Sequence, residues 1–83
     1  MMPSDQQLLT RIIIDPKVMG GKPVIKGTRI SVEIILKKLG QKIDTEEILR
    51  DFPRLTHNDI RAAILYAESL VEDIEVFPLL PAQ

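Results

Sequence analysis

The chain has 83 residues, of which 45% are hydrophobic, no cysteine and a formal net charge of −1. This length supports a single domain over 1–83, and the composition excludes a disordered chain, a disulfide scaffold and a thiolate metal site. A domain this small buries only a little more than half of the surface of its unfolded chain, so we expect a homodimer that supplies further core. We divide the domain into a β ribbon with turns over 12–30, a helical core over 31–74 and a tail over 75–83.

No apolar run in the sequence approaches the length of roughly 20 residues that spans a bilayer, and the first residues lack the pattern of a secretory signal. We therefore expect a cytoplasmic protein without membrane contact. Charge is unevenly spread. Residues 15–29 hold four basic side chains against one carboxylate, and residues 30–83 hold six against ten. Lys22 and Lys26 are thus candidate contacts for a DNA backbone, or solvated loop positions.

The first ten residues are polar and are expected to fray or to form one short helical turn. The three isoleucines at 12–14 favour a strand that is covered on both faces, and Asp15-Pro16 ends it. A second short strand is predicted at 23–25, between Gly20-Gly21 and Gly27, which supply the positive φ values of turns. Because a two-stranded ribbon alone is marginal in water, we expect it to join a sheet made by two chains.

Three helices are predicted to follow. Ser31 caps the first, and Gly40 is expected to be the left-handed residue that ends it. Its apolar stripe is Val32, Ile35, Leu36 and Leu39. Asp44 opens the second helix with Glu47 as its capping-box partner, and Pro53 stops it. Its apolar side is Ile48, Leu49 and Phe52.

The third predicted helix runs from about His57 to Asp73, with Thr56 and Asp59 as its capping box. Its apolar stripe has helical spacing and consists of Ile60, Ala63, Ile64, Ala67, Val71 and Ile74. The predicted fold is therefore mainly α, a short N-terminal β ribbon followed by a three-helix bundle that contains a helix-turn-helix.

The glycine-rich stretch "MGGKPVIKGTRISV" at 19–32 does not have the spacing of a phosphate cradle. A P-loop places lysine and then serine or threonine after its second glycine, whereas Lys26 precedes Gly27 here. The spacing also fails for a dinucleotide site, so the stretch is interpreted as two turns around a strand. Arg29 could tie the ribbon to Asp15 or to helix-end carbonyls, or it could meet phosphate.

No enzymatic activity, cofactor or metal is expected. His57 is the single histidine, and no serine or cysteine signature accompanies it. One histidine with scattered carboxylates is not a metal-ligand pattern. The acidic residues Glu68, Glu72, Asp73 and Glu75 are interpreted as a solvated helix face.

The start of the third helix is the candidate site for DNA. In a helix-turn-helix the N-terminal residues of the second helix enter the major groove. Projection along the helix axis predicts that Asn58 and Arg61 point away from the core, with His57 beside them. These side chains can pair with base edges. Two helices with a short turn also occur without DNA, and Leu65 is a candidate contact for a protein partner.

The segments "IIIDPKVMGGKPVIKGTRISVEIILKKL" and "TEEILRDFPRLTHNDIRAAILYA" together resemble one known family. The resemblance covers 12–67 and rests on Asp15-Pro16, Gly21-Lys22-Pro23, Gly27-Thr28-Arg29 and the stretch from Phe52 to Ile60. The chain is similar to the small prokaryotic family called domain of unknown function 433.

The resemblance implies a helix-turn-helix-like fold with an N-terminal β element. It also implies an antitoxin-like regulator of the VapBC type, with a PIN-like RNase toxin as partner and operator double-stranded DNA as a candidate ligand. The tail residues Val76, Phe77, Leu79 and Leu80 would then dock on the toxin. The alternative is a dimeric protein-interaction module that does not bind DNA.

Overall fold

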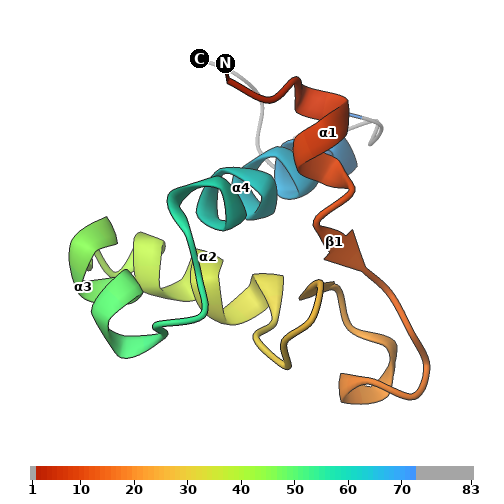
Figure 1. Cartoon of the computed structure of the whole chain (residues 1–83), viewed down its shortest axis with the longest axis horizontal. Helices are drawn as coiled ribbons and strands as arrows, with labels where there is room; N and C mark the ends of the chain where they lie inside the picture. The colour runs from red at the N-terminus through yellow and green to blue at the C-terminus, as the bar shows by residue number, and fades with distance from the viewer. Residues whose placement is uncertain (1, 73–83) are drawn as a thin grey trace, which may run out of the picture.

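The longest helix is the element on which most of the others pack. The computed structural model describes residues 2–72. Its elements are α1 (Asp5–Leu9), β1 (Ile12–Ile13), the 3₁₀ turn η1 (Met19–Gly21), β2 (Val24–Ile25), α2 (Val32–Gly40), α3 (Thr45–Asp51) and α4 (His57–Glu72). Helix α4 contacts α1, α2, α3 and β1. Figure 1 shows how these elements are arranged. The predicted mainly helical fold with a short N-terminal ribbon is confirmed.

The ribbon is antiparallel, with Ile12 opposite Ile25 and Ile13 opposite Val24. Its second strand is buried, but β1 is half-buried and Ile14 is 57% exposed. Elements of the same chain therefore cover only part of the isoleucine run, and its predicted cover by a second chain stays a prediction. The three predicted glycine turns are confirmed, with positive φ at Gly20, Gly21 and Gly27.

The N-terminal residues form a capped helix, the second of the two predicted outcomes. Ser4 Oγ accepts a hydrogen bond from Gln7 N at 3.2 Å, and Gln7 Oε1 accepts one from Ser4 N at 2.8 Å. This capping box opens α1, which packs against α4 and buries Leu8 completely. None of the helices of residues 2–72 has both the length and the apolar character needed to cross a bilayer.

The ends of α2 and α3 differ from prediction in detail. Ser31 caps α2 as expected, but Gly40 stays within the helix, and Lys42 takes the left-handed conformation with φ 64°. The amide of Ile43 donates to Lys38 O and that of Lys42 to Leu39 O, both at 3.0 Å, which is a Schellman closure. The closure returns Ile43 to the core. At α3, Asp44 accepts from Glu46 N rather than forming the predicted box with Glu47.

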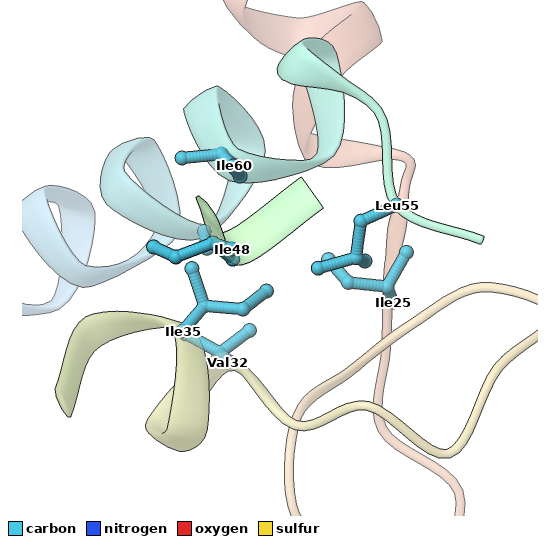
Figure 2. Close-up of a cluster of buried hydrophobic side chains, with 7 residues drawn as sticks. Ile25, Val32, Ile35, Ile48, Leu55 and Ile60 are labelled. Carbon is cyan, nitrogen blue, oxygen red and sulfur yellow. The ribbon is translucent and has the colours of Figure 1, made fainter. Parts of the chain in front are cut away.

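The hydrophobic core lies where β2, α2, α3 and α4 meet, and Figure 2 shows its side chains converging. Three of them, Ile25, Ile35 and Ile48, are at most 2% exposed. The cluster consists of Ile25, Val32, Ile35, Ile48, Leu55, Ile60 and Ala63. Because the cluster contains residues from position 25 to position 63, it fixes α2 and α3 relative to the start of α4.

The buried face of α4 is rotated by roughly a quarter of a turn from the predicted stripe. Ile64 is 46% exposed and Val71 is 62% exposed, whereas Ala62 and Ala63 are fully buried. The prediction that Ile64 and Val71 belong to the core is wrong. Helix α1 packs against α4, and Ala63 belongs to the core cluster, so contacts with several other elements select the buried face of α4. Ile74 lies outside the described residues.

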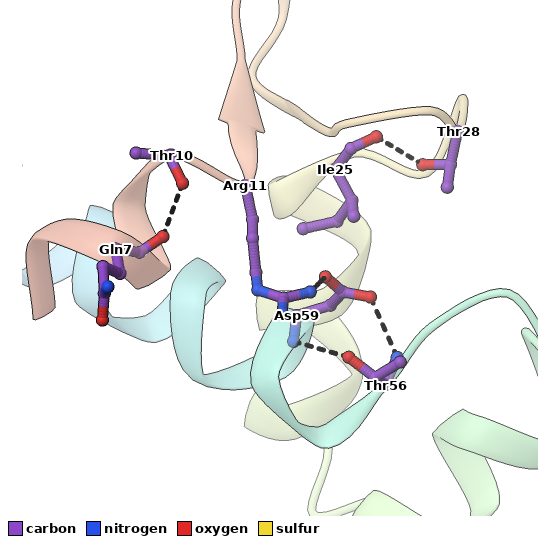
Figure 3. A network of polar contacts seen from close by, with 7 residues as sticks. All are labelled: Gln7, Thr10, Arg11, Ile25, Thr28, Thr56 and Asp59. Carbon is purple, nitrogen blue, oxygen red and sulfur yellow. Dashed lines mark hydrogen bonds and ion pairs between the residues drawn. The ribbon is translucent and has the colours of Figure 1, made fainter. Parts of the chain in front are cut away.

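The first turn of α4 is held by a polar network (Figure 3). The amide of Thr56 donates to Asp59 Oδ2 at 2.9 Å, and the amide of Asp59 donates to Thr56 Oγ1 at 3.2 Å, which confirms the predicted capping box. Asp59 also accepts a hydrogen bond from Arg11 Nη1 at 3.1 Å, an ion pair that was not predicted. The network joins the residue before β1 to the start of α4.

The core assignment predicts unequal effects for two isoleucines. Ile48→Ala should lower the free energy of unfolding by about 2–5 kcal/mol, because it leaves a cavity in a fully buried site. Ile64→Ala is the matched control and should cost less than about 1 kcal/mol, because the side chain is half-exposed in one chain. Urea denaturation measures both, and equal costs would contradict the rotated face of α4.

The capping network predicts that Asp59 matters more than its ionic partner. Asp59→Ala should cost about 2 kcal/mol, since it removes the cap acceptor and a charge-assisted hydrogen bond together. Arg11→Met keeps an apolar stem and should cost less, because Asp59 retains its hydrogen bond from Thr56 N and the freed oxygen lies at the partly exposed Arg11 side chain, where water can reach it. Thermal or urea unfolding of both variants gives the comparison. A larger loss for Arg11→Met would show that the ion pair, not the cap, dominates.

Candidate nucleic-acid interface

The connection between α3 and α4 is short and well anchored. The amide of Phe52 donates to Ile48 O at the end of α3, and that of Leu55 donates to Phe52 O, both at 2.9 Å. Leu55 is 5% exposed and belongs to the core cluster. Helix α3 contacts α4. The connection therefore sets how the first turn of α4 is presented to solvent.

The three predicted base-reading residues of α4 differ in exposure. His57 is exposed, and its Nε2 lies 3.2 Å from Glu46 Oε1 on α3. Asn58 is half-buried. Arg61 is also half-buried, and its Nη1 is buried without a hydrogen-bond partner among residues 2–72.

Arg61 thus departs from the prediction that it points freely away from the core with Asn58. A helical side chain leans toward the helix N-terminus, which a projection along the axis leaves out. Since Nη1 is buried, the edge formed by Nη1 and Nη2 cannot offer both of its nitrogens to a guanine in this conformation. The roles of His57, Asn58 and Arg61 in DNA binding stay predictions.

The two lysines expected to meet phosphate have different surroundings. Lys22 Nζ lies 2.9 Å from Glu33 Oε2 on α2. The hydrogen bond and charge of Lys22 hold the pKa of Glu33 below its usual value. Lys26 is exposed and forms no ion pair with the described residues. Of the two, Lys22 already has an anionic neighbour, which makes it the weaker candidate for a phosphate contact.

Arg29 lies beside a basic hollow that the sequence did not reveal. It is exposed and forms no ion pair with Asp15, whose Oδ1 instead accepts from Lys17 N at 2.9 Å. A notch of about 570 Å³ is lined by Val18, Gly27, Thr28, Arg29 and Arg54. We call it the arginine notch. Residues 29 and 54 are brought together only by the fold, so no local sequence signal could have found the pair.

A second hollow lies between α2 and α4 and is mainly apolar. This α2–α4 groove has a volume of about 470 Å³ and is lined by Pro23, Val32, Glu33, Leu36, Lys37, Tyr66, Ala67 and Leu70. Leu70 is 51% exposed. Leu65, the predicted partner contact, is half-buried and does not line this groove. The other predicted partner contacts, Val76, Phe77, Leu79 and Leu80, lie outside the described residues.

The described part of the chain contains no group of three or more His, Cys, Asp or Glu side chains that could hold a metal ion. The single histidine has a carboxylate neighbour in Glu46, but both side chains are exposed. This pair lies on open surface, without the enclosed pocket that usually surrounds a general base.

Known proteins include two uncharacterized proteins that are similar to this chain in sequence and one solved structure that is similar in fold. The chain is 35% identical over 54 residues to the uncharacterized protein y4eO of Sinorhizobium fredii, a match that covers 65% of this chain and 24% of that protein. It is 64% identical over 25 residues to an uncharacterized protein of Archaeoglobus fulgidus, covering 30% of this chain and 69% of that protein. The chain therefore spans about a quarter of the rhizobial relative.

A crystal structure of a DUF433 member protein from Anabaena variabilis is similar over 81% of this chain and 66% of that one. The TM-score is 0.71 and the sequence identity is 37%. The family described as "Protein of unknown function (DUF433)" matches residues 12–67, the span on which the resemblance in the sequence rests. The chain therefore belongs to the DUF433 family.

Proposed function

We propose that this protein is a non-enzymatic, antitoxin-like regulator that acts as a homodimer and binds double-stranded DNA through α3, the connection and α4. The supporting observation is the way the start of α4 is fixed. The Thr56–Asp59 capping box and the Arg11 ion pair hold the first turn, and the buried Leu55 anchors the connection before it. A reading helix needs such a rigid and exposed first turn.

The distribution of charge along α4 limits how the helix would meet DNA. Arg54 and His57 are exposed at its start, whereas Glu68 and Glu72 are exposed in its later turns. Carboxylates repel phosphates, so only the first two turns of α4 would enter the major groove. His57 and Asn58 would then face base edges, and Arg61 would have to change its rotamer to reach them.

The antitoxin part of the proposal draws on the family resemblance, which implies a PIN-like RNase toxin as partner. The apolar tail residues Phe77 and Leu80 would bind that toxin, with Leu65 as a further contact. Co-purification with a PIN-like protein encoded beside this gene tests it, and loss of the complex in Phe77→Ala with Leu80→Ala is the expected result. Action on an operator would place the protein in the cytoplasm.

The α2–α4 groove favours a second candidate function, a dimeric protein-interaction module without DNA binding. Its lining is largely apolar, and Leu70 at its edge is half-exposed. Burying such a surface against a second copy would enlarge the small apolar core of a chain of 83 residues. The two candidates share the homodimer and differ in whether duplex DNA binds.

The DNA proposal predicts that Asn58 contributes sequence preference. Selection from a random duplex library should yield half-sites about one helical turn apart. Asn58→Ala should then lose about 1–3 kcal/mol at one adenine position and bind other sequences as before. Gln41→Ala, which removes an exposed amide at the end of α2, is the control and should leave binding unchanged. Failure of the unaltered protein to bind any duplex at low salt would overturn this part of the proposal.

The homodimer predicts a difference between two neighbouring positions on α4. Leu70→Glu should convert the dimer to a monomer at micromolar concentration, because it places a charge at the edge of the α2–α4 groove. Val71→Glu is the matched control, since Val71 is exposed but does not line the groove, and it should remain a dimer. Light scattering after gel filtration measures both. A monomeric unaltered protein would contradict the homodimer.

A further inference from the structure

The loop that carries Arg29 is rigid. It follows β2 through a turn in which the amide of Thr28 donates to Ile25 O at 3.0 Å, with Gly27 at φ 79°. Thr28 Oγ1 donates to Ile25 O at 2.8 Å, as Figure 3 shows, and accepts from Ile30 N at 3.0 Å. Both the backbone and the threonine hydroxyl are thus used to fix the loop. Arg29 starts from a defined position.

Arg54 starts from a second defined turn. The hydrogen bond from Leu55 N to Phe52 O closes a turn in which Pro53 takes the second place and Arg54 the third. Proline at that place presets the backbone angle of the turn. The next residue, Leu55, is buried in the core. Arg54 is exposed, so its charge faces solvent while its neighbours on both sides are fixed.

A core contact brings the two turns together. Ile25, which accepts the bonds of the first turn, and Leu55, which ends the second, belong to one cluster and lie side by side in Figure 2. Arg29 and Arg54 consequently line the same notch, although 24 positions separate them in the sequence. The packing of two buried side chains therefore helps to bring two surface charges to one hollow.

The charge of the arginine notch is not neutralised by the described residues. No carboxylate is among the side chains that line it. The ion pairs of residues 2–72 are Arg11–Asp59, Lys22–Glu33 and His57–Glu46, so neither Arg29 nor Arg54 has a carboxylate within 4.0 Å there. Two guanidinium groups around one hollow repel each other unless an anion lies between them. The planar, always charged guanidinium suits the oxygens of a phosphate.

We propose that the arginine notch binds one phosphate group of the DNA backbone and thereby sets the register of α4 in the major groove. This inference rests on the proposed DNA binding and adds a site to it. Arg54 lies three positions before His57, the first residue of α4, so a phosphate held there flanks the reading turn. Phosphate contacts fix the position and orientation of a protein on the duplex, whereas base contacts supply specificity.

The experiment compares Arg29→Gln, Arg54→Gln and the double variant by fluorescence anisotropy, with a duplex of arbitrary sequence and a range of salt concentrations. Each single variant should weaken binding to all sequences alike. In the double variant, the magnitude of the negative slope of log K against log salt concentration should fall by about one, because both arginines bind the same phosphate. Lys42→Gln removes one exposed charge that does not line the notch, and it should lower the slope less. Unchanged circular dichroism spectra and unfolding midpoints check that the variants fold.

Three results would overturn the proposal. The first is an unchanged slope in the double variant, and the second is a reduction in slope equal to that of Lys42→Gln. The third is a reduction of about two, which would indicate two separate phosphates. A titration with inorganic phosphate, followed by amide NMR shifts of Gly27, Thr28 and Arg54, separates the sources of the phosphate. If the unaltered protein binds no duplex, the proposed DNA function fails, and the DNA backbone is then excluded as the source of the phosphate. In that case the phosphate titration tests only whether the arginine notch binds an anion. Shifts that disappear in the double variant would support an anion site, and an absence of shifts would reject it.

Discussion

The arrangement of this domain depends on the hydrogen bonds that the carboxylate of Asp59 accepts. This carboxylate is almost fully buried, and it binds both the backbone of Thr56 and the guanidinium of Arg11. A buried charge is tolerated only when its oxygens have partners, so the position of each partner is constrained by the other. Through this one group the segment that enters β1 is tied to the segment that opens α4.

The two ends of α4 differ in how they are anchored and in their surface charge. At its start, the cap, the ion pair and the anchored connection fix the backbone, and basic or neutral polar side chains lie at the surface. In its later turns the helix carries exposed carboxylates and a half-exposed leucine beside the α2–α4 groove. The proposed function assigns DNA to the first end of α4 and a second protein chain to the other.

Much of the fold could be predicted from local signals, because caps and turns depend on residues three or four positions apart. Ser31, Thr56 with Asp59 and the glycine turns are of this kind, and "SDQQ" at 4–7 carries the same capping-box signature. The rotated face of α4 could not be read from the sequence, since Ile64 fits the apolar periodicity as well as Ala63 does. Ala63 is buried in the cluster formed with β2, α2 and α3, so contacts between distant segments decide between the two.

The candidate site was less accessible to prediction than the fold. The sequence indicates where α4 begins and hence that His57 and Asn58 lie at its first turn. It does not indicate that Lys22 pairs with Glu33 or that Arg61 leans back until one of its nitrogens is buried. The meeting of Arg29 with Arg54 depends on contacts between distant segments, which neither spacing nor composition contains.

The left-handed conformation of Lys42 has a consequence for stability. A side chain with a Cβ atom in that region is strained by about 1 kcal/mol relative to glycine, and the Schellman closure maintains it because Ile43 returns to the core. The bend between α2 and α3 is therefore held by tertiary packing rather than by a local preference of the chain. Homologous chains with glycine at this position would make the same bend without that strain.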